Sequence, residues 1–449
     1  MIRGFLYRPE VLLAATFAGL ILLGALLLRL PFAQRAQSVG FVDALFTSTS
    51  AVCVTGLTTV DTATAYSRAG QTTILLLIQL GGLGVMTFGA IAAEFLRLRV
   101  SLGSQAALQD SFFHEEARGN VASAVRRILL MTLLIESVGA GLVYAGLRGL
   151  EPARGGAFDA VFHSVSAFCN AGFSSFPENL VALRHSPLIV WTLMVLITLG
   201  GLGYMVLFEA VGRGWTALRR RPPVSVLWTL HSRVVLRASA VLTFGGGAVL
   251  ALIGLGDPAL SLGGRVLHGL FQSVSARTAG FNTVDIGALP LPGLLILILL
   301  MFIGGSPGSC AGGIKTTSAT VWLARLWARL SGRDTVTILK RRIPVDLVRR
   351  ATLLIAVATL WNAAGVMLLS ATEGSRAGVR LEQLIFEQIS AFGTVGLSTG
   401  ITPTLTTLGK LWITVTMFVG RVGPLTVALV VMAHPHKLYE YPTERVMIG

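Results

Sequence analysis

Four short segments of this chain have the residue types that can ligate a dehydrated cation through backbone carbonyls. Each combines a central glycine with small and hydroxyl-bearing neighbours, and they read FTSTSAVCVTGLTT (46–59), FHSVSAFCNAGFSS (162–175), FQSVSARTAGFNT (271–283) and FEQISAFGTVGLST (386–399). An ion that sheds its water needs oxygen ligands in exchange, and carbonyl rings supply them without holding the ion too tightly. Glycine permits the backbone conformation that turns such carbonyls inward. The segments therefore predict an ion pathway.

The central glycines are almost evenly spaced, with 116, 108 and 116 residues between Gly56, Gly172, Gly280 and Gly396. Four equivalent copies can enclose one pathway along a common axis, so we predict a single filter. Its residues are Cys53, Val54, Thr55, Gly56, Cys169, Asn170, Ala171, Gly172, Thr278, Ala279, Gly280, Phe281, Gly393, Thr394, Val395 and Gly396. These stretches resemble the TVGYG filter of potassium channels, but Leu or Phe follows each glycine. A shorter or less ideal filter is expected.

The third segment departs from the pattern. Phe271 and Gly280 are nine residues apart, whereas the equivalent pairs are ten apart, and Arg277 lies beside the predicted filter. Direct contact would repel a permeating cation. We therefore expect Arg277 to brace the loop through nearby carbonyls or through Asp285.

A short helix is expected before each glycine, over 41–51, 157–167, 266–276 and 381–391. Each would have about three turns, too few to cross a bilayer. Their C-terminal ends would direct partial negative charge toward a central cation. The alternative is four re-entrant hairpins that only pack. It is disfavoured because unsatisfied backbone in a membrane is too costly to repeat four times without use.

Composition indicates an integral membrane protein. Hydrophobic residues make up 53% of the chain and charged residues only 13%, whereas soluble domains have about 25% charged residues. Apolar runs long enough to cross a bilayer lie near 10–30, 72–96, 128–147, 187–212, 236–255, 291–330 (interrupted), 351–371 and 408–432. We predict an all-α integral membrane protein with eight transmembrane helices. Four M1–P–M2 repeats, each a span, a pore segment and a second span, would surround one ion pore in a pseudo-fourfold arrangement.

The whole chain, 1–449, is predicted to be a single membrane domain. Repeats one to four cover about 9–97, 126–214, 233–330 and 350–433, and a cytoplasmic tail follows at 434–449. The first span is interpreted as an anchor, because no small-residue cleavage site follows it. The connectors are too short for a separate soluble domain, so any nucleotide sensing is assigned to a partner.

The net charge of +15 follows the predicted topology. Lys and Arg number 23 in the segments on the side of the termini and 11 in the opposite loops. The basic side is cytoplasmic by the positive-inside rule. We therefore predict a multi-pass protein of the inner (cytoplasmic) membrane with both termini in the cytoplasm, contacts with lipid headgroups, and no nucleic-acid partner.

A second glycine cluster follows each filter segment: LGGLG (80–84), LGGLG (199–203), IGGSPG (303–308) and VGRVGP (419–424). Close helix packing explains the first two. The third belongs to GGSPGSCAGGIKTTS (304–318), which breaks a helix and is expected to face a water-filled cavity. In the fourth, Arg421 replaces the glycine found at 82, 201 and 305. A charge at this depth is usually functional.

These motifs resemble the superfamily of K⁺ transporters that includes the TrkH, KtrB and plant HKT proteins, over essentially the whole chain. SVSARTAGFNT and GGSPGSCAGGIKTT are the most specific, and eight spans without an extra N-terminal pair are most like KtrB. The resemblance implies an intramembrane gating loop at 304–317, with Arg421 at the constriction. The implied gate residues are Gly304, Gly305, Ser306, Pro307, Gly308, Gly312, Gly313, Lys315 and Arg421.

The resemblance further implies a homodimer with one pore per subunit and a cytoplasmic KtrA-like nucleotide-binding ring. Many members are stimulated by Na⁺, and Gly56 implies K⁺ selectivity because serine there favours Na⁺ in plant relatives. No cofactor is expected in this chain, and nucleotides would bind only the partner. Lys315 is equally consistent with a gating role and with a lysine that stabilises the loop end. Glu136, alone in its span, is a candidate buried pairing partner.

Three other functions are weighed against K⁺ uptake. A Na⁺-selective or unselective cation pathway would use the same fold. A secondary transporter for an organic substrate would bind it at broken helices, but four pore segments weigh against this. An enzyme is least favoured, because the sequence has no nucleophile–base pair or metal cluster. Cys53, Cys169 and Cys310 form no metal or disulfide pattern and are expected to be small filler residues.

Overall fold

The computed structural model describes residues 9–35, 38–97, 121–150, 155–218, 228–255, 260–374, 376 and 378–423. The expected tail at 434–449, the end of the last predicted span (424–432), and most of the connector between repeats one and two lie outside these residues. Within them the regular secondary structure is helical, apart from a hairpin of two short strands, β1 (Thr337–Ile338) and β2 (Arg341–Arg342).

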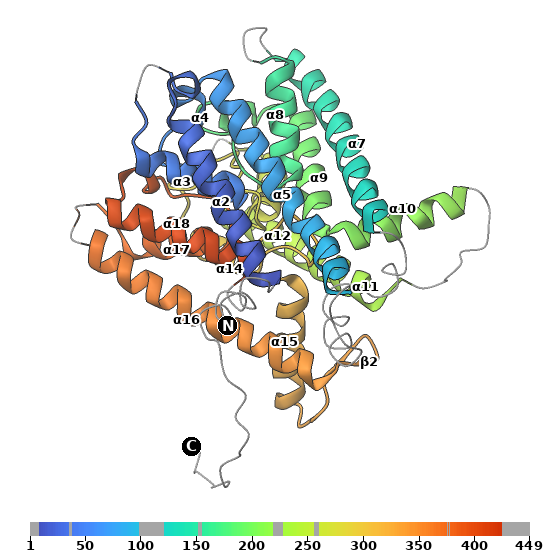
Figure 1. Ribbon diagram of the computed structural model, residues 1–449. Helices are drawn as coiled ribbons and strands as arrows, with labels where there is room; N and C mark the ends of the chain where they lie inside the picture. The colour runs from blue at the N-terminus through green and yellow to red at the C-terminus, as the bar shows by residue number, and fades with distance from the viewer. Residues whose placement is uncertain are drawn as a thin grey trace.

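Long helices form the outer part of the bundle (Figure 1). They are α2 (Pro9–Arg29), α5 (Arg68–Arg97), α7 (Val121–Arg148), α9 (Pro187–Leu202) and α16 (Val345–Glu373). A further long helix is composite: α11 (Leu230–Ala240) continues through a π-helical turn, η4 (Val241–Gly245), into α12 (Gly246–Ile253). α2, α5, α7 and α9 lie side by side in Figure 1 and contact one another in that order.

Four short helices pack inside these long ones, close to where they are predicted. They are α3 (Phe41–Val52), α8 (Ala157–Phe168), α13 (Leu262–Ser275) and α17 (Leu381–Gly393). Phe46, Phe162, Phe271 and Phe386, at equivalent positions, are completely buried. The aromatic side chains thus fix each short helix among its neighbours.

The remaining elements range from single 3-10 turns to helices of 15 or 16 residues. They are η1 (Pro31–Ala33), α4 (Thr62–Ala65), η3 (Val181–Leu183), α10 (Tyr204–Leu218), α14 (Leu291–Phe302), α15 (Thr316–Leu330), η5 (Thr402–Thr404) and α18 (Thr407–Val422). α14 and α15 are the two halves of the span that the sequence predicts to be interrupted. The predicted span at 187–212 is also broken, because α9 and α10 meet at Gly203 with a bend of 107°. Gly203 has a φ of 88°, which continues no α-helix.

Four described helices are long and apolar enough to cross a membrane: Val11–Arg29, Val125–Arg148, Leu230–Ile253 and Val345–Glu373. The bent pair α9–α10 would add a fifth. These four are the first spans of the four predicted repeats. Only 28% of each apolar window is buried inside the protein, and large side chains such as Leu134, Leu252 and Leu360 are exposed. A surface of this kind suits lipid rather than water. The full count of eight spans stays a prediction.

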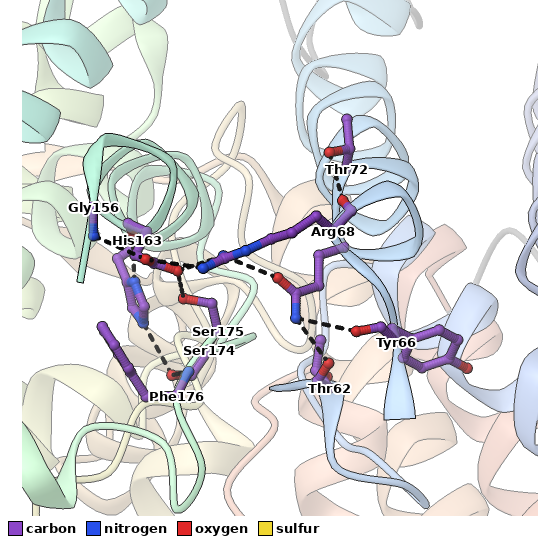
Figure 2. A network of polar contacts seen from close by, with 11 residues as sticks. Thr62, Tyr66, Arg68, Thr72, Gly156, His163, Ser174, Ser175 and Phe176 are labelled. Atoms are coloured by element: carbon purple, nitrogen blue, oxygen red, sulfur yellow. Dashed lines mark hydrogen bonds and ion pairs between the residues drawn. The ribbon is translucent and has the colours of Figure 1, made fainter. Parts of the chain in front are cut away.

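Ion pairs join neighbouring repeats beside the N-terminal ends of two short helices. Arg68, at the start of α5, reaches Asp159 in the first turn of α8, with 2.6 Å between Nη1 and Oδ1 (Figure 2). Lys410 of α18 likewise contacts Asp43 in the first turn of α3 at 2.8 Å. Each acid also lies where the partial positive charge of a helix N-terminus favours it.

Asp159 accepts further hydrogen bonds besides the ion pair, and its partners Arg68, Gly156 and Ser175 are labelled in Figure 2. Its carboxylate also accepts hydrogen bonds from the Ser175 hydroxyl and the Gly156 N–H. Burial alone would raise the pKa of Asp159, but the bonds from Arg68, Gly156 and Ser175 outweigh burial and bring that pKa below its ordinary value. The aspartate is therefore ionised at neutral pH and joins α5 to α8.

We predict that Asp159→Asn lowers the free energy of unfolding by about 1–3 kcal/mol, because the amide cannot accept all of these bonds. The melting temperature in detergent measures the loss. Asp334→Asn is the matched control, since Asp334 and its partner Arg329 are 91% and 66% exposed, and such pairs contribute little. Equal melting temperatures for the two variants would contradict the role of Asp159.

Candidate functional site

The four central glycines meet in a closed ring. A Cβ built on each glycine would overlap the carbonyl oxygen of the residue that precedes the next glycine in chain order, and the fourth closes onto the first. The pairs are Gly56 with Ala171 at 2.5 Å, Gly172 with Ala279 at 2.6 Å, Gly280 with Val395 at 2.5 Å, and Gly396 with Thr55, which is closer still. Side chains would therefore force the four loops apart. All sixteen residues of the predicted filter are buried, and all lie in these loops except Gly393, which is the last residue of the fourth short helix.

Each loop has left-handed backbone at two alternate positions. The φ angles of the glycines lie between 67° and 97°. The residue two positions earlier is also left-handed in every loop: Val54 at 56°, Asn170 at 60°, Thr278 at 80° and Thr394 at 48°. This conformation is strained for the β-branched side chains of Val54, Thr278 and Thr394, so its recurrence at these positions indicates a geometry that the surrounding structure enforces.

A serine in or next to the last turn of each short helix fastens the loop that follows. The Ser50 hydroxyl accepts the Gly56 N–H at 2.9 Å, and the Ser390 hydroxyl accepts the Gly396 N–H at 3.1 Å. The hydroxyls of Ser166, Ser275 and Ser390 donate to the carbonyl that follows the glycine. These serines are not among the predicted site residues, although one stands five or six residues before every glycine.

Glu387 fastens the outer part of the fourth loop. Its carboxylate is fully buried and accepts bonds from the hydroxyls of Ser398, Thr399 and Thr402 and from the Thr399 N–H. Burial raises the pKa of Glu387, and the bonds oppose this only in part. At the equivalent position, His163 contacts Ser174 at 3.0 Å. Different residue types thus hold the same segment in different repeats.

The missing residue of the third segment is absorbed between Ser275 and Thr278, because the left-handed positions keep their spacing. Arg277 points away from the ring toward the π-helical turn. Its guanidinium donates to the Ser239 carbonyl at 3.3 Å and to the Ser239 hydroxyl at 3.0 Å. The sequence predicts that Arg277 bonds either a nearby carbonyl or Asp285. The structure has the bond to a carbonyl, while the Asp285 carboxylate accepts the N–H of Gly287.

The predicted gating loop, 304–317, contacts the helices that follow two other glycine loops. Ser306 N–H donates to the Gly201 carbonyl at 3.1 Å, and Gly313 N–H donates to the Gly420 carbonyl at 3.4 Å. The loop also borders the ring, because a Cβ on Gly312 would overlap the Thr394 side chain. The loop therefore lies next to the ring and is hydrogen-bonded to the helices that follow the second and fourth glycine loops.

The predicted gate residues are all in or against this loop. A Cβ on Gly304 would overlap the Gly312 carbonyl, one on Gly305 would lie 3.1 Å from the Gly201 carbonyl, and one on Gly203 2.5 Å from the Pro307 carbonyl. Gly308 accepts the Tyr204 N–H at 3.1 Å.

Two cations hold the predicted gating loop. The Arg421 guanidinium donates to the carbonyls of Cys310 and Gly81, so it joins the loop to α5. Lys315 donates to the Ala311 carbonyl and thereby closes the loop on itself. Neither cation has an ion-pair partner within the residues that the structure describes. Within the described residues, the hydrogen bonds of both cations go to backbone carbonyls, and a buried charge without an opposite charge beside it is costly.

The cysteines, which show no pattern in the sequence, are all buried and unbridged. Two of them converge: a Cβ on Gly82 would lie 2.9 Å from the Cys169 sulfur and 3.4 Å from the Cys310 sulfur. Among the described residues, no group of three or more His, Cys, Asp or Glu side chains could hold a metal ion. Spacing along the chain could not reveal this meeting, because it joins a filter loop to the gating loop.

Comparisons with known proteins are consistent with this geometry. A family model described as "TrkH: Cation transport protein" matches residues 12–440. The potassium/sodium uptake protein NtpJ of Enterococcus hirae is 37% identical, over 98% of this chain and 97% of the relative. Ktr system potassium uptake protein B of Vibrio alginolyticus is 36% identical, over 98% and 95%. The corresponding Bacillus subtilis protein is 34% identical, over 100% and 98%.

A solved structure is also similar. The potassium transporter TrkH from Vibrio parahaemolyticus superimposes with a TM-score of 0.71 over 96% of this chain and 84% of that one. Its sequence identity is 20%, so this likeness concerns the fold alone.

We predict that Gly396→Ala disrupts the ring, because the added methyl group would overlap the Thr55 carbonyl oxygen. Gly400→Ala is the matched control: it has the same φ of 93°, but a Cβ there meets nothing within 4 Å. Backbone strain of about 1–2 kcal/mol is common to both variants. The melting temperature should therefore fall clearly further for Gly396→Ala. Equal losses would show that close approach at the ring is unimportant.

Proposed function

Because the chain belongs to the TrkH family of cation transport proteins, we propose that it mediates potassium uptake across the cytoplasmic membrane as the ion-translocating subunit of a Ktr-type system. The observation that carries this proposal is the closed ring of four glycine loops. Full-length relatives named as Ktr system potassium uptake protein B support the Ktr assignment.

In this proposal the four M1–P–M2 repeats supply eight spans and surround a single pore, as one membrane domain with both termini in the cytoplasm. Four long apolar helices and four buried short helices support the arrangement. The excess of Lys and Arg on one side of the predicted topology supports the orientation.

The ring acts as the selectivity filter. The carbonyls of Thr55, Ala171, Ala279 and Val395 lie where the loops meet, and their oxygens replace the hydration shell of K⁺. The serine tethers and left-handed residues preorganise these carbonyls. Each loop has only one glycine after its left-handed residue, so few ligand layers are available and selectivity is expected to be lower than in a channel with a longer filter.

The loop 304–317 acts as the gate together with Lys315 and Arg421. Its hydrogen bonds to Gly201, Gly420 and, through Arg421, Gly81 support a closed state in which the loop obstructs the path. Opening requires these bonds to be exchanged for water. Backbone bonds to a glycine-rich loop can be exchanged without moving the surrounding helices.

A homodimer with a cytoplasmic KtrA-like nucleotide-binding ring would regulate the pore. Ktr in the names of several relatives supports a multi-component system, and nucleotides would bind the ring rather than this chain. Complementation of a K⁺-uptake-deficient strain tests this, with and without the ring protein. Regulated growth only with the ring supports the assembly.

A Na⁺-conducting function is the specific alternative, since NtpJ of E. hirae is named a potassium/sodium uptake protein. Stimulation of K⁺ uptake by Na⁺ is a separate property, and the flux assay described next measures it as well. The isotopic flux of Rb⁺ and of Na⁺ into liposomes that contain the purified protein separates these cases. Equal Na⁺ and Rb⁺ fluxes would contradict selective K⁺ uptake.

We predict that Gly56→Ser weakens Rb⁺ uptake and raises the Na⁺ to Rb⁺ flux ratio without preventing membrane insertion. Serine is strained at a φ of 97°, and its Cβ would lie 2.5 Å from the Ala171 carbonyl oxygen. Uptake kinetics and competition by Na⁺ measure the effect, with Gly400→Ser as the control for strain outside the ring. An unchanged affinity and flux ratio in Gly56→Ser would exclude this loop from the filter.

We also predict that Arg421→Ala raises Rb⁺ flux. The substitution removes bonds to the Cys310 and Gly81 carbonyls from the closed state, and each 1.4 kcal/mol lost shifts the equilibrium about tenfold toward opening. Arg421→Lys, which keeps the charge, and a deletion within 306–313 are companion variants, the deletion being expected to leak as well. At equal expression, flux no higher than the parent in both Arg421→Ala and the deletion would contradict the gate.

A further inference from the structure

Glu136 is a buried acid at membrane depth to which the proposed pore gives no role. It lies in α7, well inside the apolar window Val125–Arg148, and is 5% exposed. Its carboxylate accepts the side-chain amide of Gln79 on α5 at 3.1 Å. Its backbone carbonyl accepts the Ser164 hydroxyl at 2.7 Å, which seats α8 against α7.

The same carboxylate contacts the predicted filter. The Cys169 thiol is 3.9 Å from Oε1 of Glu136 and 3.4 Å from Oε1 of Gln79. Cys169 is the first filter residue of the second loop. Glu136 therefore contacts the second filter loop through the Cys169 side chain, two residues before the ring carbonyl of Ala171.

Glu136 has weaker compensation than other buried acids of the described chain. Asp159 pairs with Arg68, Glu373 pairs with Arg376, and Glu387 accepts several hydroxyl bonds. Glu136 has one amide and a weakly donating thiol, and none of the described cationic side chains forms an ion pair with it. A buried carboxylate in this position requires either a proton or a nearby positive charge.

Positive charge is present on the other side of Cys169. The sulfurs of Cys169 and Cys310 both border Gly82, and the Cys310 carbonyl accepts a bond from Arg421. Lys315 follows in the same loop and donates to Ala311. A continuous chain of contacts therefore leads from Glu136 through the two thiols to the cations of the gating loop.

We propose that Glu136 is ionised and serves as a counter-charge. It keeps the electrostatic free energy of K⁺ favourable between the filter and the cationic gate. The proposal rests on the proposed function. Two fixed cations below a filter repel an entering K⁺, and a carboxylate behind the filter offsets that repulsion, because charges interact strongly where water is scarce. Glu136 is thus a positioning residue that acts through the field and contacts no ion.

Gln79 makes a charge-swap experiment possible, because the amide and the carboxylate face each other across 3.1 Å. Glu136→Gln keeps the shape and removes the charge. The double variant Gln79→Glu/Glu136→Gln returns the charge to the opposite side of the same contact. Rb⁺ flux in liposomes is measured for the parent and both variants, with melting temperature and inserted amount recorded for each.

We expect Glu136→Gln to lower Rb⁺ flux about tenfold, as an uncompensated cationic gate implies, and the double variant to recover most of it. In an Arg421→Ala background the effect of Glu136→Gln should shrink, since less positive charge needs compensation. Parental flux in Glu136→Gln would mean that the acid is protonated and would overturn the inference. Loss without recovery in a folded double variant would assign Glu136 a purely structural role and would also overturn it.

If Glu136→Gln fails to insert, the double variant decides: flux near the parent supports the counter-charge, and absence of flux contradicts it. Failure of the proposed function is distinguished by the parent protein. If the parent protein carries no Rb⁺, the proposed function as a pore is wrong. If the parent is active and Glu136→Gln is equally active, only the proposed role of Glu136 is wrong.

Discussion

The structure depends on one constraint: four stretches of irregular backbone must meet so closely that no side chain fits between them. Each glycine lies against the carbonyl that precedes the next glycine, and the ring closes on itself. In an apolar surrounding such backbone is tolerable only if protein satisfies it or water reaches it. The short helices, the serine tethers and the buried aromatic residues all contribute to meeting that requirement. The fold can be understood as the packing needed to hold this ring.

Symmetry ends on the side of the gating loop. The glycines Gly81, Gly200 and Gly420 pack against the carbonyl ends of the short helices, but the third repeat has a loop here and the fourth has Arg421 in place of a glycine. These two departures contact each other through the Cys310 carbonyl. Asymmetry of this kind suits a gate, because a single loop can move while the ring keeps its shape. In this account, selectivity and gating are assigned to different parts of the repeat.

The sequence predicted the parts of the site whose backbone geometry restricts residue type. Glycines at a ring of close contacts and short helices before them are visible as a repeat, and the structure places α3, α8, α13 and α17 within a few residues of the predicted ranges. The break at 304–318 was visible for the same reason, since proline and clustered glycine exclude a continuous helix.

Other features depend on contacts between distant segments and leave no local signal. The bend at Gly203 was missed because its flanking residues are as apolar as those of a continuous span. Cys169 lies close to Cys310, and Glu136 accepts a hydrogen bond from Gln79. Both contacts join residues of different repeats. Left-handed Val54 and Thr394 contradict the preferences of their residue types, so propensity argued against them. Only tertiary packing enforces such positions.

The most direct measurement of the central claim is the location of Rb⁺ by anomalous diffraction from crystals of the protein. We expect anomalous peaks on the axis of the ring, within coordination distance of the Thr55, Ala171, Ala279 and Val395 carbonyls. Rb⁺ bound only elsewhere in a protein that still transports it would contradict the ring as the ion pathway.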